Sequence, residues 1–224
     1  MAAAPGITAL AIGLAVGFSG TYADARSAEA DRVVLELQVL SFGASNSADL
    51  RLARQTVERI LASARIPAAW RDCGGGDRCD DSSGGRLFVK VLLLPITRAS
   101  DPSVTGDSFR TASIPTALVY VPRIAEIVKE MRETPIRGSQ VALTTLTPGH
   151  VIGLTIAHEL GHLLGLSHSS RGLMKPQLNL DDVIAFRHAG LKFSEKDAEQ
   201  MRQVLHVELV KRDSVPLARD ASRQ

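Results

Sequence analysis

The sequence predicts an α+β domain, and three observations support this prediction. Residues 32–40 and 86–96 are runs of mainly aliphatic and β-branched residues, with the length of ordinary strands. Residues 48–64 space their apolar side chains three and four positions apart, which indicates an amphipathic helix. Residues 148–164 are apolar nearly all round, which is typical of a helix buried in the middle of a domain. We therefore expect a sheet with helices packed against it.

The first part of the chain is expected to form the first strands and a helix. Residues 32–40 alternate apolar with polar side chains in their middle, as a strand with two different faces does. The helix over residues 48–64 must stop before Pro67, because proline cannot continue it. Trp70, the only tryptophan, is expected in the core, on a strand that runs into a cysteine-containing loop.

The middle of the chain is expected to complete the sheet. Residues 86–96 indicate a buried central strand, since they are apolar almost throughout. Residues 101–114 are polar and predict a loop with a short edge strand. Residues 117–121 predict a further strand, after which Pro122 can start a helix that reaches Arg132.

Residues 158–168 read HELGHLLGLSH, a spacing that suits a zinc ion. His158 and His162 are four residues apart, so on a helix they share one face and can reach the same ion. Gly165 can adopt the left-handed conformation that ends a helix, which lets the chain turn back and deliver His168. Three neutral histidines leave the fourth tetrahedral position to water, which distinguishes a catalytic zinc site from a structural one.

Glu159 follows the first of these histidines. Its side chain projects from a neighbouring sector of the helix, so it can reach a water on the metal rather than the metal itself. It is the expected general base. The pattern of histidine, glutamate and glycine is too specific to arise readily by chance, and the motif therefore indicates an enzyme.

The chain resembles the metzincin clan of zinc endopeptidases, and within it the matrixins. Beyond the third histidine, residues 169–176 (SSRGLMKP) are similar to the matrixin continuation, in which His-Ser leads to Leu-Met-x-Pro. The resemblance covers about residues 148–176. It implies that Met174 lies in a tight turn beneath the zinc and gives the imidazoles an apolar floor. By the same analogy, the pocket after the scissile bond is lined by Lys175, Pro176 and Gln177.

The resemblance also implies a metzincin-like fold. Such a fold has a twisted, mostly parallel sheet with an antiparallel edge strand, a central zinc-binding helix, and a small lower subdomain with a C-terminal helix. A capping pattern at Ser194 predicts that last helix, which would end near Val210. Residues before the motif show nothing similar to the calcium and structural-zinc loop of matrixins, so we expect one zinc per chain. A polypeptide substrate would lie extended along an edge strand within residues 105–114.

The expected function is that of an exported zinc-dependent endopeptidase, which hydrolyses peptide bonds through a zinc-bound water with Glu159 as general base. The alternative is an exported zinc-binding interaction protein that keeps the scaffold without catalysis. Glu159 argues against it, because a binding-only site has no use for a carboxylate beside the metal. Zinc-dependent hydrolysis of a non-peptide amide would use the same residues.

The N-terminus indicates export, either secretion or delivery to a periplasm. Residues 7–18 form an apolar run, and Ala23 and Ala25 fit a small-x-small cleavage site, so residues 1–25 are expected to be a signal peptide. The run is too short for a membrane span, and no later segment supplies one. A retained N-terminal anchor is the alternative. The remainder would be a single domain over residues 26–211 and a flexible tail over residues 212–224.

The two cysteines, Cys73 and Cys79, flank a short loop rich in glycine and aspartate. In an exported chain they are expected to form a local disulfide. A cysteine switch, in which Cys73 would block the zinc, is disfavoured because Cys73 follows the first strand and helix. The aspartates of this loop match no calcium-binding template. A formal charge of +2 and the lack of a basic block indicate no nucleic-acid partner.

Overall fold

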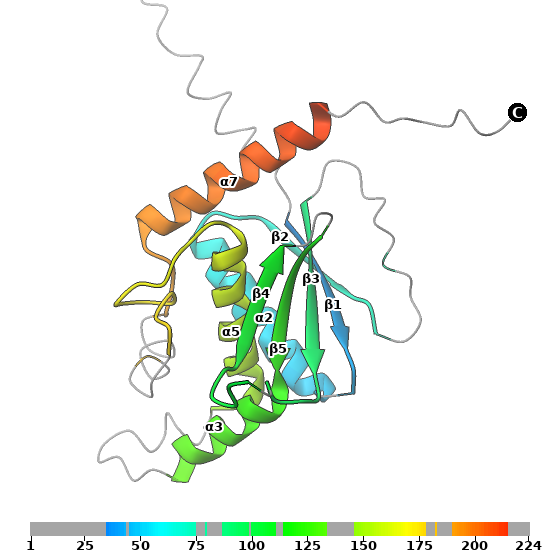
Figure 1. Cartoon of the computed structure of the whole chain (residues 1–224), viewed down its shortest axis with the longest axis vertical. Helices are drawn as coiled ribbons and strands as arrows, with labels where there is room; N and C mark the ends of the chain where they lie inside the picture. Colours follow the sequence, from blue (N-terminus) through cyan, green and yellow to red (C-terminus); the bar gives the residue numbers. More distant parts are fainter. Residues whose placement is uncertain are drawn as a thin grey trace, which may run out of the picture.

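The structure is a computed structural model that describes residues 35–43, 45–74, 79, 87–98, 100–110, 114–133, 146–177, 182 and 190–214. Within these residues, five strands and four helices follow one another along the chain (Figure 1). They are β1 (Leu35–Ser41), α2 (Ser47–Ser63), β2 (Ala68–Asp72), β3 (Leu87–Leu94), β4 (Gly106–Arg110), β5 (Pro115–Tyr120), α3 (Val121–Glu133), α5 (Pro148–Leu163) and α7 (Glu195–Ser214).

The strands form one sheet in the order β2-β1-β3-β5-β4. Neighbouring strands are parallel except for β4, which pairs antiparallel with β5 at one edge. Only four residues separate Arg110 from Pro115, too few for the crossover that a parallel pair requires. The predicted α+β class, with a mostly parallel sheet and an antiparallel edge strand, is therefore confirmed.

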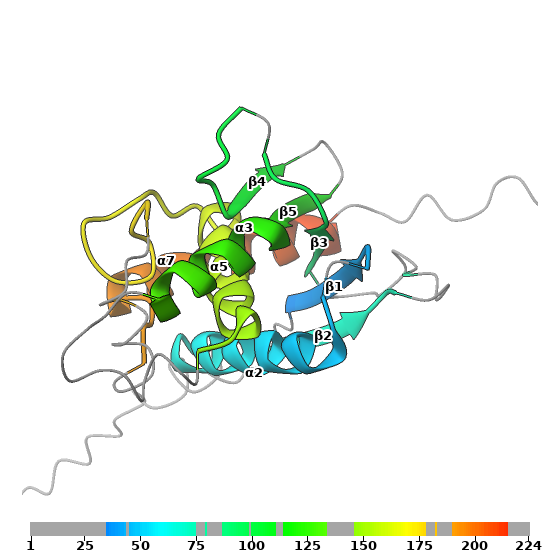
Figure 2. The same cartoon turned by 90° about the horizontal axis from the view of Figure 1, so that it is seen from below.

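The core lies between one face of the sheet and two helices, α2 and α5 (Figure 2). Side chains alternate between the faces of a strand, so every second residue of β1, β3 and β5 points to these helices. The pairing brings them into rows, for example Leu37 beside Val89 and Val91 beside Ala117. These strand residues are almost completely inaccessible: Leu35, Leu37, Val39, Val89, Val91, Leu93, Ala117 and Val119.

Two glycines of α5 allow this helix to cross α2 closely. A Cβ atom on Gly149 would lie 2.5 Å from the carbonyl oxygen of Asp49, and one on Gly153 would lie 2.5 Å from the Cβ of Thr56. The side chain of Asp49 also accepts a hydrogen bond from the backbone N–H of Gly149 at 2.9 Å. The start of α5 is thus fixed by α2, because one of its free N–H groups is satisfied from that helix.

We expect Gly153→Ala to lower the free energy of unfolding by about 1–2 kcal/mol. An added methyl group inside a tightly packed contact destabilises the fold by about 1–3 kcal/mol. The higher helix propensity of alanine offsets up to about 1 kcal/mol of this loss. Urea denaturation measures the difference. Gly74→Ala is the control, because its Cβ would meet only the Asp72 carboxylate, at 3.3 Å. Equal stability of the Gly153→Ala chain and the parent would contradict this account of the crossing.

The C-terminal helix α7 begins as predicted at Ser194. The Ser194 hydroxyl accepts a hydrogen bond from the Asp197 N–H at 3.1 Å and donates one to the Asp197 carboxylate at 2.7 Å. The helix continues to Ser214, past the expected end near Val210, where the Ser214 hydroxyl bonds the Val210 carbonyl at 2.9 Å. It is joined to the end of α2 by Arg202, whose guanidinium donates to the Ala64 carbonyl at 2.7 Å.

Several predictions from the sequence concern residues outside the described ones. These include the signal peptide over residues 1–25, most of the loop between the cysteines, and the tail beyond Ser214. Among the described helices, none combines the length and apolar character needed to cross a membrane. Trp70, which was expected in the core, is only half-buried and packs against the core from β2.

Candidate metal centre

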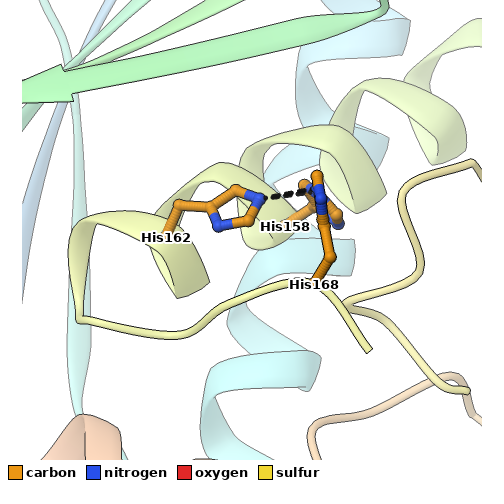
Figure 3. Close-up of side chains that lie close together, drawn as sticks. All are labelled: His158, His162 and His168. Carbon is orange, nitrogen blue, oxygen red and sulfur yellow. Dashed lines mark hydrogen bonds between the residues drawn. The ribbon is translucent and has the colours of Figure 1, made fainter. Parts of the chain in front are cut away.

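Three histidine rings converge at the C-terminal end of α5 (Figure 3). The Nε2 atom of His162 lies 3.0 Å from that of His158 and 3.1 Å from that of His168. Two nitrogens that bind one zinc tetrahedrally at 2.0–2.1 Å are about 3.3 Å apart, so the cluster has nearly the spacing of a zinc site. Gly165, with φ +86°, ends the helix and turns the chain toward His168, as the sequence predicts.

Backbone carbonyls fix the orientation of two of these rings. The Nδ1 atom of His158 lies 2.8 Å from the Leu173 carbonyl, and that of His162 lies 2.9 Å from the Leu166 carbonyl. A carbonyl only accepts hydrogen bonds, so each Nδ1 must carry a proton and each neutral ring presents a lone pair at Nε2. Two lone pairs 3.0 Å apart repel each other unless a cation lies between them. The donor set therefore fits a metal ion.

The protonation of the rings agrees with this assignment. Burial lowers the pKa of His158 to about 4, against the opposing effect of its hydrogen bond to Leu173, and the two neighbouring histidines add to the decrease. Burial and His162 lower the pKa of His168 as well. A metal binds the neutral form of imidazole, so binding at neutral pH would displace no proton from His158.

Met174, which the resemblance to metzincins places beneath the zinc, packs against Gly161 of α5. It is 1% exposed, and a Cβ on Gly161 would lie 2.5 Å from its sulfur, so the thioether packs directly on the middle of the HELGH motif. The turn that carries it is closed by a hydrogen bond from the Ser169 N–H to the Met174 carbonyl at 2.8 Å. The absence of a side chain at Gly161 is what admits the sulfur to this position.

Glu159 is buried beside the histidines, with 5% of its surface exposed. Burial raises the pKa of its carboxyl to about 7, a hydrogen bond from the Ser108 side chain opposes the increase, and the charge of Asp107 adds to it. Among the described residues, only the three histidines bring ligand atoms within 4.8 Å of one another. The Glu159 carboxylate is thus close to the metal centre without being part of it.

A cleft of about 1160 Å³ opens over this site. It is lined by the stretch that ends in β4 and, next to it, by α5 along Val151, Thr155 and Glu159. Beyond the histidines the cleft is bounded by the three residues predicted for the substrate pocket, Lys175, Pro176 and Gln177. Their position beside the cleft agrees with that prediction, while their role in binding a substrate remains a prediction.

Ion pairs surround the cleft. Arg98 lies 3.4 Å from the Asp107 carboxylate, and Lys175 lies 2.6 Å from that of Asp182. Arg123 of α3 contacts Glu126 at 3.2 Å and Glu130 at 3.1 Å. Arg98, Arg123 and Lys175, the Lys and Arg side chains among the described lining residues, are thus each paired with a carboxylate, which compensates their charge.

Sequence reasoning missed two contributions to the cleft. The helix from Pro122 was predicted, but not that Ile127 and Met131 of α3 would line the cleft together with α5. The contact of Gly106 and Ser108 with Glu159 was also missed. A single glycine or serine in a polar segment gives no signal of such a contact, because the contact depends on the sheet.

The histidine in the first turn of α5, His150, caps the helix instead of binding the metal. Its Nδ1 lies 2.9 Å from the Thr147 hydroxyl.

Away from the cleft, Cys73 and Cys79 are joined in a disulfide, so the expected bond is present and Cys73 is not available as a switch.

Sequence comparison finds no matching family model and no matching curated protein. Comparison of structures does find similar chains. The crystal structure of archaemetzincin from Methanopyrus kandleri superposes with a TM-score of 0.50 at 14% sequence identity, over 77% of this chain and 96% of that one. The chain has a metallopeptidase fold. Metalloproteinase-II from Bacteroides fragilis gives a TM-score of 0.48 at 16% identity, over 77% of this chain and 53% of that one.

At 14% identity, the likeness to archaemetzincin establishes the fold and nothing finer. It supports the expected architecture, in which the helix that carries the first two histidines lies against a mostly parallel sheet. The resemblance to matrixins in particular is not tested by it. What the site does must therefore be argued from its own residues.

Proposed function

We propose that this protein is a zinc-dependent endopeptidase. The observation that supports the proposal is the convergence of three imidazole lone pairs next to a buried carboxylate, at the floor of an open cleft. His158, His162 and His168 would hold one zinc ion. When bound, zinc supplies Lewis acidity toward water and toward the carbonyl of the scissile peptide bond.

The residues of the chain have separate tasks in this reaction. Glu159 accepts a proton from the attacking water and then passes it to the leaving amine, so it acts first as a base and then as an acid. In the metal-free site, burial raises its pKa to about 7. A bound cation would lower this value, because it favours the charged form of a nearby carboxyl.

The edge strand β4 supports a polypeptide as substrate. Among the described strands, β4 pairs only with β5, so its other side is free to bond an extended chain. Its residues from Gly106 to Ser108 line the cleft above Glu159. An extended peptide bound there would pass its backbone over the metal centre, and the apolar surfaces of Ile127, Met131 and Val151 would receive one of its side chains.

Incubation with unfolded polypeptides tests the proposal directly. The purified, zinc-loaded chain should cleave a panel of unfolded proteins, and a chelator should abolish cleavage until zinc is returned. N-terminal sequencing of the products would show whether large apolar side chains are preferred near the scissile bond. A fully zinc-loaded chain that cleaves nothing would instead favour the non-catalytic interaction protein, whereas cleavage of small amides alone would favour a non-peptide amidase.

We also propose that the chain is exported, because an apolar N-terminal run precedes a disulfide-bonded domain. We expect that mass spectrometry of unreduced, exported protein finds a chain that begins near residue 26 and has no free thiol. The same chain made in a reducing cytosol should contain two thiols. A mature protein with residues 1–25 still attached, or with both thiols free after export, would contradict the proposal.

A further inference from the structure

The strand β4 contacts the helix α5 at Glu159. This contact involves residues that are not part of the histidine motif. Register places Gly106 opposite Val119 and Ser108 opposite Ala117. Both partners are completely buried on the face of the sheet that packs against the helices. Residues directly opposite each other share a face, so Gly106 and Ser108 also point toward α5.

Gly106 leaves the space that the Glu159 side chain occupies. A Cβ atom at position 106 would lie 2.7 Å from Oε1 of Glu159 and 3.1 Å from its Cγ. It would also lie 2.5 Å from the Cγ2 atom of Thr155, one helical turn before Glu159. No side chain larger than hydrogen therefore fits here unless both the Glu159 carboxylate and the Thr155 methyl group move.

Ser108, two residues further along the same face, places a hydroxyl group on the side of β4 that faces Glu159. Its side chain lowers the pKa of the Glu159 carboxyl, against the effect of burial. The strand β4 thus contributes both the space that the carboxylate occupies, at Gly106, and a hydroxyl group beside it, at Ser108. Among the described residues, it is not one of the ligand atoms that gather within 4.8 Å at the metal centre.

We infer that Gly106 and Ser108 are positioning residues, which hold the Glu159 carboxylate against the edge strand and prevent it from swinging into the histidine cluster. A carboxylate that bound the metal would occupy the position needed by water and could no longer accept a proton. The contact with β4 therefore keeps Glu159 available as a base. This inference rests on the proposed function for its catalytic consequence, and on geometry alone for the contact itself.

Steady-state kinetics of the zinc-loaded full chain test the catalytic consequence. Ser108→Ala should lower kcat by about 10- to 100-fold, the range expected from a small misplacement of a reacting group, with KM and zinc content nearly unchanged. Ser108→Thr keeps the hydroxyl and should retain most of kcat. Gly106→Ala should also lower kcat, because the added methyl group would displace the Glu159 carboxylate together with the Thr155 side chain. Ser63→Ala, which removes a hydroxyl on α2 far from the cleft, is the control and should match the parent.

A stability measurement on the metal-free full chain tests the contact without reference to activity. Ser108→Ala should lower the urea midpoint of the parent chain but have little effect in a chain that already carries Glu159→Leu, because leucine cannot accept the hydrogen bond. Equal shifts in both chains, or an unchanged kcat in Ser108→Ala, would overturn the inference. If the parent cleaves nothing while the coupling is observed, the proposed function fails and the contact stands.

Discussion

Glu159→Gln is expected to reduce hydrolysis of unfolded polypeptides by at least about 10²–10⁴-fold, the range typical of general acid–base catalysis. Glutamine keeps the size of the side chain and can still accept the hydrogen bond from Ser108, but it cannot take a proton. The three histidines are untouched, so zinc content and folding should match those of the parent. Rates are measured with the zinc-loaded proteins on one unfolded substrate, together with metal analysis of each sample.

Met174→Leu provides the matched comparison for Glu159→Gln. Leucine has a similar volume and keeps an apolar floor beneath the histidines, so we expect a much milder loss of activity. A Glu159→Gln chain that cleaves at the parental rate would eliminate Glu159 as the general base. Equal losses in both variants would indicate that activity responds to any disturbance of the site.

His162→Ala and His168→Ala should each lower zinc affinity by more than about 100-fold, since even the loss of a residue that only supports a metal ligand costs about 10- to 100-fold. His162 should have the stronger effect on the site, because its Nε2 lies within 3.1 Å of both other Nε2 atoms. Competition with a chromophoric chelator measures the affinities, and the parent should bind one zinc per chain.

His206→Ala is the control for this series, because His206 is exposed on α7 and is not part of the histidine cluster. It should bind zinc as the parent does. Full zinc retention after His168→Ala would remove that residue from the ligand set. Two tightly bound zinc ions in the parent would contradict the expected stoichiometry.

Local signals in the sequence predicted most elements of the fold. The helix expected over residues 48–64 is α2 at Ser47–Ser63, because its apolar spacing and its proline stop are both local. The edge strand was expected only somewhere within residues 101–114, and β4 occupies Gly106–Arg110. Polar edge strands have weak patterns, since packing on one side leaves most of their residues free to vary.

The candidate site also has one part that the sequence predicts and another part that depends on the fold. The histidines, Gly165 and Met174 could be assigned because they lie together in the sequence and match a motif. The environment of Glu159 could not, since Gly106 and Ser108 reach it only through the pairing of β4 with β5. The closing of the cleft by α3 likewise depends on how that helix packs against α5.

The metal centre is contained in residues 158–174, since these residues include the three histidines, the carbonyls that orient two of them, and Met174. An unfolded chain still carries all three imidazoles on one short segment, so we expect it to bind zinc with part of the native affinity. Zinc would then stabilise the native state by less than its native affinity alone implies, because a ligand that also binds the unfolded chain shifts the equilibrium less. The strand β4 contacts Glu159 but is not part of residues 158–174. Partial unfolding that detaches β4 would therefore abolish hydrolysis before it releases the metal.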